Sequence, residues 1–143
     1  MDYSAAHLRR GDYLGEIDNF GLLSKDYYSR FLKEDGQLII CTDDEKLAIE
    51  YWGEHERLKI LGPESISPWE TIAILSRAKN LYIANSSLSW WAGVVQRSRQ
   101  GITYIPQPWF KIFAPNDRRM VYPGMTELSS DWENSENHNF HTQ

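Results

Sequence analysis

Short apolar stretches alternate with segments of helical periodicity along most of the chain. Five stretches are mainly apolar, and each ends at glycine, proline or polar residues. They cover residues 3–8, 38–41, 58–61, 81–84 and 102–105. Runs of this length and continuity are typical of strands that are covered on both faces of a parallel sheet.

The segments between these stretches carry apolar residues at helical spacing. Their expected starts are near Ser24, at Thr42 or Asp43, at Ser67, and at Ser87 or Ser89. The start at Ser67 is the clearest, because Pro68 follows it and Glu70 stands three residues further on, as in a capping box. The alternation predicts an α/β fold, a Rossmann-like parallel sheet with right-handed crossovers and helices on both faces.

The chain has 143 residues, which suits one domain with a substantial core. We expect residues 1–128 to form one binding domain. Residues 129–143 are polar and aperiodic, and we expect them to form a disordered tail. No apolar run approaches the roughly 20 residues of a membrane helix, and the first residues do not resemble a secretory signal. These features predict a protein that is cytoplasmic or peripheral at the cytoplasmic face of the membrane.

Charge and cysteine content narrow the function classes. The net charge of −5 argues against a generic nucleic-acid binder. Residues 77–119 nevertheless carry seven basic residues and one acidic residue, which suits either an anionic ligand nearby or a solvated basic helix face. The one cysteine, Cys41, excludes a disulfide framework within the chain, and in a predicted buried strand we expect it to be inert.

Three polar clusters follow three of the predicted strands, at residues 7–13, 42–44 and 85–87. In a doubly wound sheet, ligands bind beyond the carboxyl ends of the strands, so these clusters should share one edge. The adjacent Arg9 and Arg10 match phosphate oxygens, and the cluster at 85–87 precedes a helix N-terminus that favours an anion. The alternatives are structural: the arginines pair with acidic loops, the serines cap a helix, and Asp43 and Asp44 form an N-cap pair.

Two of these clusters resemble a known family. Residues 7–13, His-Leu-Arg-Arg-Gly-Asp-Tyr, resemble the H-x-R-R-G-D-Y signature of the α-1,2-fucosyltransferases of glycosyltransferase family 11. Residues 83–92 resemble the family's I-A-N-S-S-F-S-W-W-A segment, and residues 106–110 its P-x-x-W-F segment. Thr42-Asp43-Asp44 also recurs at the matching strand end, and order and spacing agree from about residue 3 to about residue 125.

The resemblance implies an inverting enzyme that transfers L-fucose from GDP-fucose to a galactoside hydroxyl, with no metal and no further cofactor. It implies that this chain is the donor-binding half of a GT-B-type enzyme built from two Rossmann-like halves. Arg9 would contact the β-phosphate of the donor and Arg10 would support it, because a fixed cation stabilises the charge left on GDP when the C1–O bond breaks. The other implied donor-binding residues are His7, Asp12, Thr42, Asp43, Glu70, Asn85, Ser86 and Ser87.

Two features depart from the family pattern. The acidic residue thought to bind guanine falls on Thr71, so the preceding Glu70 is the candidate for that role. Family members carry the arginine motif near their midpoint, so we expect the N-terminal half, which would contribute to acceptor binding, to be missing here. Asp12 is the carboxylate nearest to the arginines in sequence, and we expect it to support the loop by pairing with Arg9 or Arg10 rather than to act as the general base.

The expected partners are GDP-fucose and a glycan acceptor that ends in galactose, with no nucleic acid. Self-association through the surface left by the missing half is also expected. The alternative function is a non-catalytic nucleotide- or glycan-binding module, with the aromatic-rich residues 90–113 as its recognition surface. The Trp90-Trp91 pair fits either packing against the sheet or stacking on a ligand.

Overall fold

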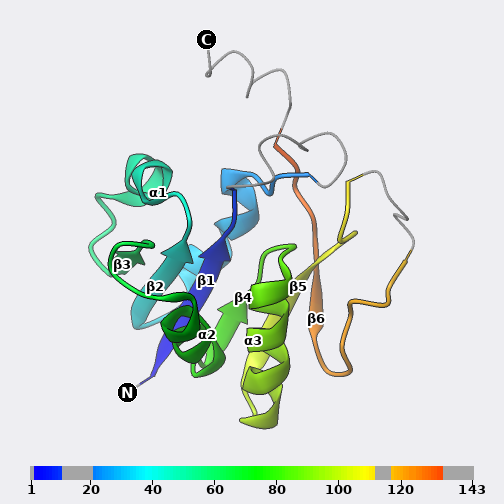
Figure 1. The fold of residues 1–143 in the computed structure, drawn as a ribbon. Coiled ribbons are helices and arrows are strands. Elements are labelled where there is room, and N and C mark those ends of the chain that lie inside the picture. Colours follow the sequence, from blue (N-terminus) through cyan, green and yellow to red (C-terminus); the bar gives the residue numbers. More distant parts are fainter. Residues whose placement is uncertain (1, 11–20, 112–116, 134–143) are drawn as a thin grey trace.

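The structure is a computed structural model that describes residues 2–10, 21–111 and 117–133. Strands and helices alternate through these ranges, as the hydrophobic pattern predicts (Figure 1). The strands are β1 (Tyr3–Leu8), β2 (Gln37–Thr42), β3 (Leu58–Leu61), β4 (Asn80–Tyr82), β5 (Ile102–Gln107) and β6 (Thr126–Ser129). The helices are α1 (Glu45–Trp52), α2 (Pro68–Ser76), α3 (Ser87–Ser98) and two short 3₁₀ helices, η2 (Lys25–Tyr28) and η3 (Phe31–Lys33).

The described strands form one parallel sheet in the order β3-β2-β1-β4-β5-β6. Strand β1 lies in the interior, where Ala6 is in register with Ile40 of β2 and with Tyr82 of β4. The chain runs outward from β1 through β2 and β3 and then returns to the other side of β1 at β4. This order confirms the Rossmann-like α/β fold, and its direction reverses between β1 and β4, where such folds bind ligands.

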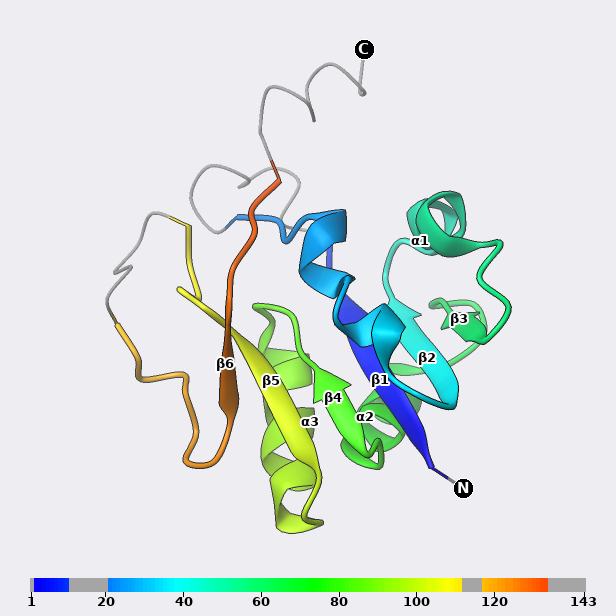
Figure 2. The ribbon, with the colours of Figure 1, turned by 180° about the vertical axis from the view of Figure 1, so that it is seen from behind.

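Helices cover both faces of the sheet. Helices α2 and α3 pack on one face, and α1 with the 3₁₀ helices packs on the other, as the two opposite views show (Figures 1 and 2). Alternate residues of β1 serve the two cores, with Ala5 facing α2 and α3, and Ala6 and Leu8 facing α1 and the 3₁₀ helices. The apolar runs of the sequence are continuous because both faces of these strands are buried.

Side-chain caps fix the starts of two helices. The Ser67 hydroxyl accepts the Glu70 N–H at 3.2 Å, and the Glu70 carboxylate accepts the Ser67 N–H at 3.0 Å, which confirms the predicted capping box. Helix α1 is capped by Asp44, not by Thr42 or Asp43. Asp44 Oδ1 accepts the Leu47 N–H at 3.1 Å, whereas the Thr42 hydroxyl accepts the Asp44 N–H at 2.9 Å.

The segment after Ser24 forms η2 and η3 instead of one regular helix. The hydroxyl of Tyr27 donates to the Ile83 carbonyl at 2.9 Å, and that of Tyr28 donates to the His7 carbonyl at 2.8 Å. Both rings are therefore anchored to the sheet from consecutive positions, which favours short helical turns over one continuous amphipathic helix.

The folded chain continues past the predicted boundary at residue 128. Ser129 belongs to β6, and the backbone of Trp132 forms an antiparallel bridge with Leu23. The prediction of a tail that starts at Ser129 is thus corrected for residues 129–133, and residues 134–143 lie outside the described ranges. The hydrophobic pattern did not predict β6, because this outer strand has a polar composition and mostly exposed side chains.

A buried amide joins α3 to the sheet. The Gln96 side chain is fully buried. Its Nε2 lies 3.0, 3.2 and 2.9 Å from the carbonyl oxygens of Ala78, Lys79 and Ile102, and its Oε1 accepts the hydroxyl of Thr103. One side chain thus satisfies backbone groups from the α2–β4 turn and from β5.

None of the helices in the described part of the chain combines the length and apolar character that crossing a lipid bilayer requires.

Candidate functional site

The polar clusters meet at the carboxyl edge of the sheet. The strands are parallel, so the residues after β1, β2 and β4 emerge on the same side. A pocket of about 180 Å³ opens there. Its lining consists of His7, Arg9, Thr42, Asp43, Gly62, Pro63, Ile66, Ser67, Pro68, Thr71 and Leu88.

Four of the predicted site residues line this pocket: His7, Arg9, Thr42 and Asp43. Most of the remaining lining comes from the loop after β3 and the first turn of α2. Sequence reasoning missed this part because its apolar and small residues carry no chemical motif. Two signals pointed to it: the capping box that starts at Ser67, and the family resemblance, which places the guanine-binding position on Thr71.

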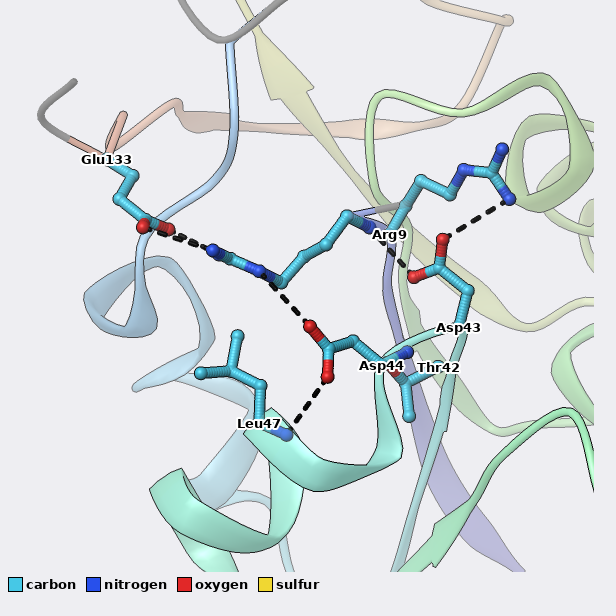
Figure 3. Close-up of polar contacts among 7 residues, drawn as sticks. Arg9, Thr42, Asp43, Asp44, Leu47 and Glu133 are labelled. Atoms are coloured by element: carbon cyan, nitrogen blue, oxygen red, sulfur yellow. Dashed lines mark hydrogen bonds and ion pairs between the residues drawn. The ribbon is translucent and has the colours of Figure 1, made fainter. Parts of the chain in front are cut away.

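Arg9 stands at the pocket beside a carboxylate. Arg9 Nη1 lies 3.6 Å from Asp43 Oδ2, and the two side chains are 30% and 22% exposed. Asp43 Oδ1 accepts the backbone N–H of Arg10 at 2.8 Å, so the same carboxylate ties the end of β1 to the end of β2. Arg9 therefore presents a partly exposed cation to the pocket in a defined place (Figure 3).

Arg10 is directed away from the pocket and is buried. Its guanidinium forms a two-point contact with Glu133, and its Nε lies 3.8 Å from Asp44 Oδ2. Burial lowers the pKa of Arg10, but the hydrogen bond to Glu133 and the charges of Glu133 and Asp44 raise it more. Figure 3 shows the Arg9–Asp43 pair on one side of this network and Glu133 on the other. The geometry suits the supporting role expected of Arg10.

His7 is a neutral imidazole at the pocket. The residue is 5% exposed and lines the pocket, and its Nδ1 has no hydrogen-bond partner among the described residues. Burial, with the neighbouring charge of Arg9, lowers the pKa of His7 from 6.5 to about 3. An uncharged imidazole with a buried, unsatisfied nitrogen can form a hydrogen bond with a ligand through that nitrogen.

Acidification is expected to destabilise the fold through His7. Between pH 6.5 and about 3 the unfolded chain binds a proton at His7 that the native chain does not. The free energy of unfolding therefore falls by about 1.4 kcal/mol for each unit by which the pH is lowered within that window. Urea unfolding between about pH 7 and about pH 5, followed by tryptophan fluorescence, measures this slope.

In His7→Gln the part of the slope that belongs to His7 should disappear. His55→Gln is the matched control, because it removes a half-buried histidine outside the pocket lining. Equal slopes in the wild type and His7→Gln would contradict the burial of a neutral His7.

The cluster at 85–87 lies at the start of α3, outside the pocket lining. Asn85 is buried and its amide donates to the Gly21 carbonyl at 3.3 Å. Ser86 occupies the N-cap position without a side-chain capping bond, and Ser87 is exposed in the first turn. Helix α3 starts at Ser87, as one of the two predicted starts proposed, and contributes Leu88 to the lining.

Other candidate residues lie elsewhere. Glu70 is engaged in the capping box and does not line the pocket, whereas Thr71 does. Asp12 lies outside the described residues. Cys41 is buried in β2, as predicted, and this burial raises the pKa of its thiol to about 12, which agrees with an inert thiol. In the described ranges, no group of three or more His, Cys, Asp or Glu side chains could hold a metal ion.

The two adjacent tryptophans, Trp90 and Trp91, lie in different surroundings. Trp90 Nε1 donates to the Met120 carbonyl at 2.6 Å, and its ring makes an edge contact with Tyr122. Trp91 is 58% exposed. Of the two alternatives for the pair, packing describes Trp90, but these contacts are with Met120 and Tyr122, whereas Trp91 faces solvent.

Comparison with known proteins relates the chain to glycosyltransferases. It is 31% identical over 122 residues to an alpha-1,2-colitosyltransferase of Escherichia coli, across 75% of this chain and 41% of that protein. It is 30% identical over 118 residues to the O-antigen biosynthesis glycosyltransferase WbnK of Escherichia coli, across 75% of this chain and 39% of that protein. The chain thus spans about two fifths of the length of these curated relatives.

No family model matches the chain, and no solved structure matches it significantly. The two relatives support a glycosyltransferase family in general, without singling out family 11 or fucose.

Proposed function

We propose that this chain binds the nucleotide-sugar donor of a glycosyltransferase, with Arg9 as the contact to the diphosphate. One observation carries the proposal. In a chain similar to glycosyltransferases, a partly exposed arginine lines a pocket at the carboxyl edge of a doubly wound sheet. The motif at residues 7–13 further supports GDP-fucose as the donor and α-1,2 transfer of L-fucose to a galactose-terminated glycan, with inversion and with no metal or further cofactor.

The chemistry of transfer explains the need for Arg9. When the C1–O bond of the donor breaks, its electron pair stays on the β-phosphate oxygen, while the acceptor oxygen attacks C1 from the opposite side and its proton passes to a general base. A guanidinium held near that oxygen stabilises the transition state more than the bound donor. Asp43 keeps the guanidinium in place and partly balances its charge before the donor arrives.

The pocket lining divides into two chemical parts. Arg9, Asp43 and His7 supply charge and hydrogen bonds, whereas Pro63 and Ile66 from the loop after β3 supply apolar surface. The volume of about 180 Å³ is smaller than the roughly 300 Å³ or more that encloses a drug-sized ligand, so the pocket suits one portion of a nucleotide sugar.

We assign the guanine base of the donor to the apolar part of the pocket lining. Thr71, whose hydroxyl donates to the Ser67 carbonyl at 3.1 Å, is the polar residue of α2 that lines the pocket, so we assign the contact with the base to it. Glu70 would have to leave the capping box before it could contact guanine.

A second donor is favoured by a specific comparison. One relative is a colitosyltransferase, so colitose is the alternative sugar for the same site. Because Arg9 contacts the diphosphate and not the sugar in this proposal, both donors use the same phosphate contact. Competition between GDP-fucose and the corresponding colitose donor would rank the two sugars.

Thermal unfolding with and without ligand tests the proposal. A ligand at about 100 times its dissociation constant stabilises the native state by about 2.7 kcal/mol, which raises the midpoint by roughly 5–10 °C in a domain of this size. We expect this shift with GDP-fucose and with GDP, and none with ADP. Equal shifts with GDP and ADP would refute guanine selectivity, and no shift with any of the three would refute donor binding by this chain.

A further inference from the structure

The guanidinium of Arg10 is paired with a carboxylate 123 positions away in the sequence. Arg10 Nη2 donates to Glu133 Oε1 at 3.2 Å, and Nη1 donates to Oε2. Two parallel bonds of this kind fix the orientation of both planar groups. The side chains are 6% and 17% exposed, so water competes weakly for either partner.

Glu133 is also held by its own backbone. Its N–H donates to the Leu22 carbonyl at 2.6 Å, next to the bridge between Leu23 and Trp132. Gly21 has a positive φ of 83°, and a Cβ built there would lie 2.6 Å from the Trp132 ring. A glycine at this position therefore lets the ring pack against the chain and keeps Glu133 beside Arg10.

The backbone of Arg10 connects this pair to the pocket. The Arg10 N–H donates to Asp43 Oδ1 at 2.8 Å, and Asp43 Oδ2 faces Arg9 Nη1 at 3.6 Å. Glu133 itself does not line the pocket. A change that releases the Arg10 side chain therefore reaches Asp43, and through it Arg9, along atoms that are in direct contact.

We infer that Glu133 is a positioning residue of the site: by holding Arg10, it fixes Asp43 and Arg9 where the diphosphate binds. The ligand-binding part of this inference rests on the proposed function. Without the Glu133 charge, the acidic side chain that remains near the Arg10 guanidinium among the described residues is Asp44, at 3.8 Å, so the charge of this buried group is less well balanced. The Arg10 backbone then loses its fixed place, and Arg9 loses its defined orientation.

Glu133→Gln tests the inference, with Glu127→Gln as the matched control. Glu127 lies on β6 and pairs with Arg118 away from the pocket. Dissociation constants for GDP and guanosine separate the phosphate contact from the rest of the ligand. We expect Glu133→Gln to weaken GDP binding about tenfold or more and guanosine binding less than about twofold, because only the phosphate contact depends on Arg9. The control should change neither.

A readout without ligand keeps the inference separate from the proposed function. Hydrogen exchange of the Arg10 amide, which donates to Asp43, is compared with that of the Ile83 amide, which donates to the Tyr104 carbonyl at 3.0 Å within the sheet. Exchange at Arg10 should accelerate about tenfold or more beyond any change at Ile83 in Glu133→Gln. Glu133→Asp keeps the charge but shortens the side chain, so the exchange rate of its Arg10 amide should lie between those of the wild type and Glu133→Gln. This variant keeps the inference testable if Glu133→Gln fails to fold.

The outcomes are distinct. Failure of the wild type to bind GDP overturns the proposed function, and the exchange measurement still tests the positioning of Arg10. Unchanged exchange at Arg10 in Glu133→Gln overturns the inference whatever the ligand result. Equal weakening of GDP and guanosine would also overturn it, because a general loss of structure does not single out the phosphate.

Discussion

Replacing Arg9 with alanine is expected to weaken GDP binding about 100-fold or more while guanosine binding stays within about twofold. Among the described residues that line the pocket, Arg9 is the one arginine. A 100-fold loss corresponds to about 2.7 kcal/mol, which is within the range for charge-assisted hydrogen bonds to a phosphate. Isothermal titration of both ligands at low and moderate salt measures the effect and its screening.

Two further variants sharpen this prediction. Arg9→Lys keeps the charge but loses the planar fork, and it should recover only part of the lost affinity. Arg77→Ala removes an exposed arginine at the other end of α2 and should leave GDP binding unchanged. GDP binding by Arg9→Ala that equals the wild type would remove the proposed phosphate contact.

The Gln96→Ala variant is expected to lose about 3 kcal/mol of unfolding free energy. Truncation removes a donor shared by the carbonyls of Ala78, Lys79 and Ile102, leaves the Thr103 hydroxyl without the amide oxygen, and opens a cavity beneath α3. Urea unfolding followed by tryptophan fluorescence measures the change.

The matched control is Gln37→Ala. Gln37 also donates to backbone carbonyls, those of Leu38 and Arg57, but it lies exposed at the start of β2. Water can replace its bonds, so the control should cost less than about 1 kcal/mol. A loss of that small size in Gln96→Ala would show that α3 does not depend on the buried amide.

Five of the described strands were predictable because each contains a short, mainly apolar run, and in the inner strands this run is buried on both faces. The predicted runs at 3–8 and 58–61 coincide with β1 and β3, and the other three lie within about two residues of the observed strands. Strand β6 was not predictable, since it is an outer strand whose exposed residues show no apolar run. The short helices near Tyr27 and Tyr28 were also beyond reach, because hydroxyl bonds to distant carbonyls set their shape.

The site was predictable where a polar or charged residue stands at the end of a strand. His7, Arg9, Thr42 and Asp43 follow this rule, and they line one pocket. The sequence did not show which of the two adjacent arginines lines the pocket: Arg9 does, whereas the Arg10 guanidinium pairs with Glu133. The roles of these residues toward a donor remain predictions.

Other contributors gave no usable signal. Glu133 stands in a polar, aperiodic stretch, and its contact with Arg10 depends on how β6 and the segment around Leu22 come together. The residues of the β3–α2 loop are ordinary turn residues until the fold closes them around the pocket. Asp12, outside the described residues, keeps its predicted supporting role as a prediction.

The large sequence separation of Arg10 and Glu133 also determines when their ion pair can form during synthesis of the chain. The two residues are separated by 123 positions, and a ribosome adds about 5–20 residues per second, so the carboxylate follows its arginine by roughly 6–25 s. During that interval β1 can pair with β2 and β4, before Glu133 is available to pair with the Arg10 guanidinium. The support that Glu133 gives to Arg10 can therefore form only after all the described residues that line the pocket have been synthesised.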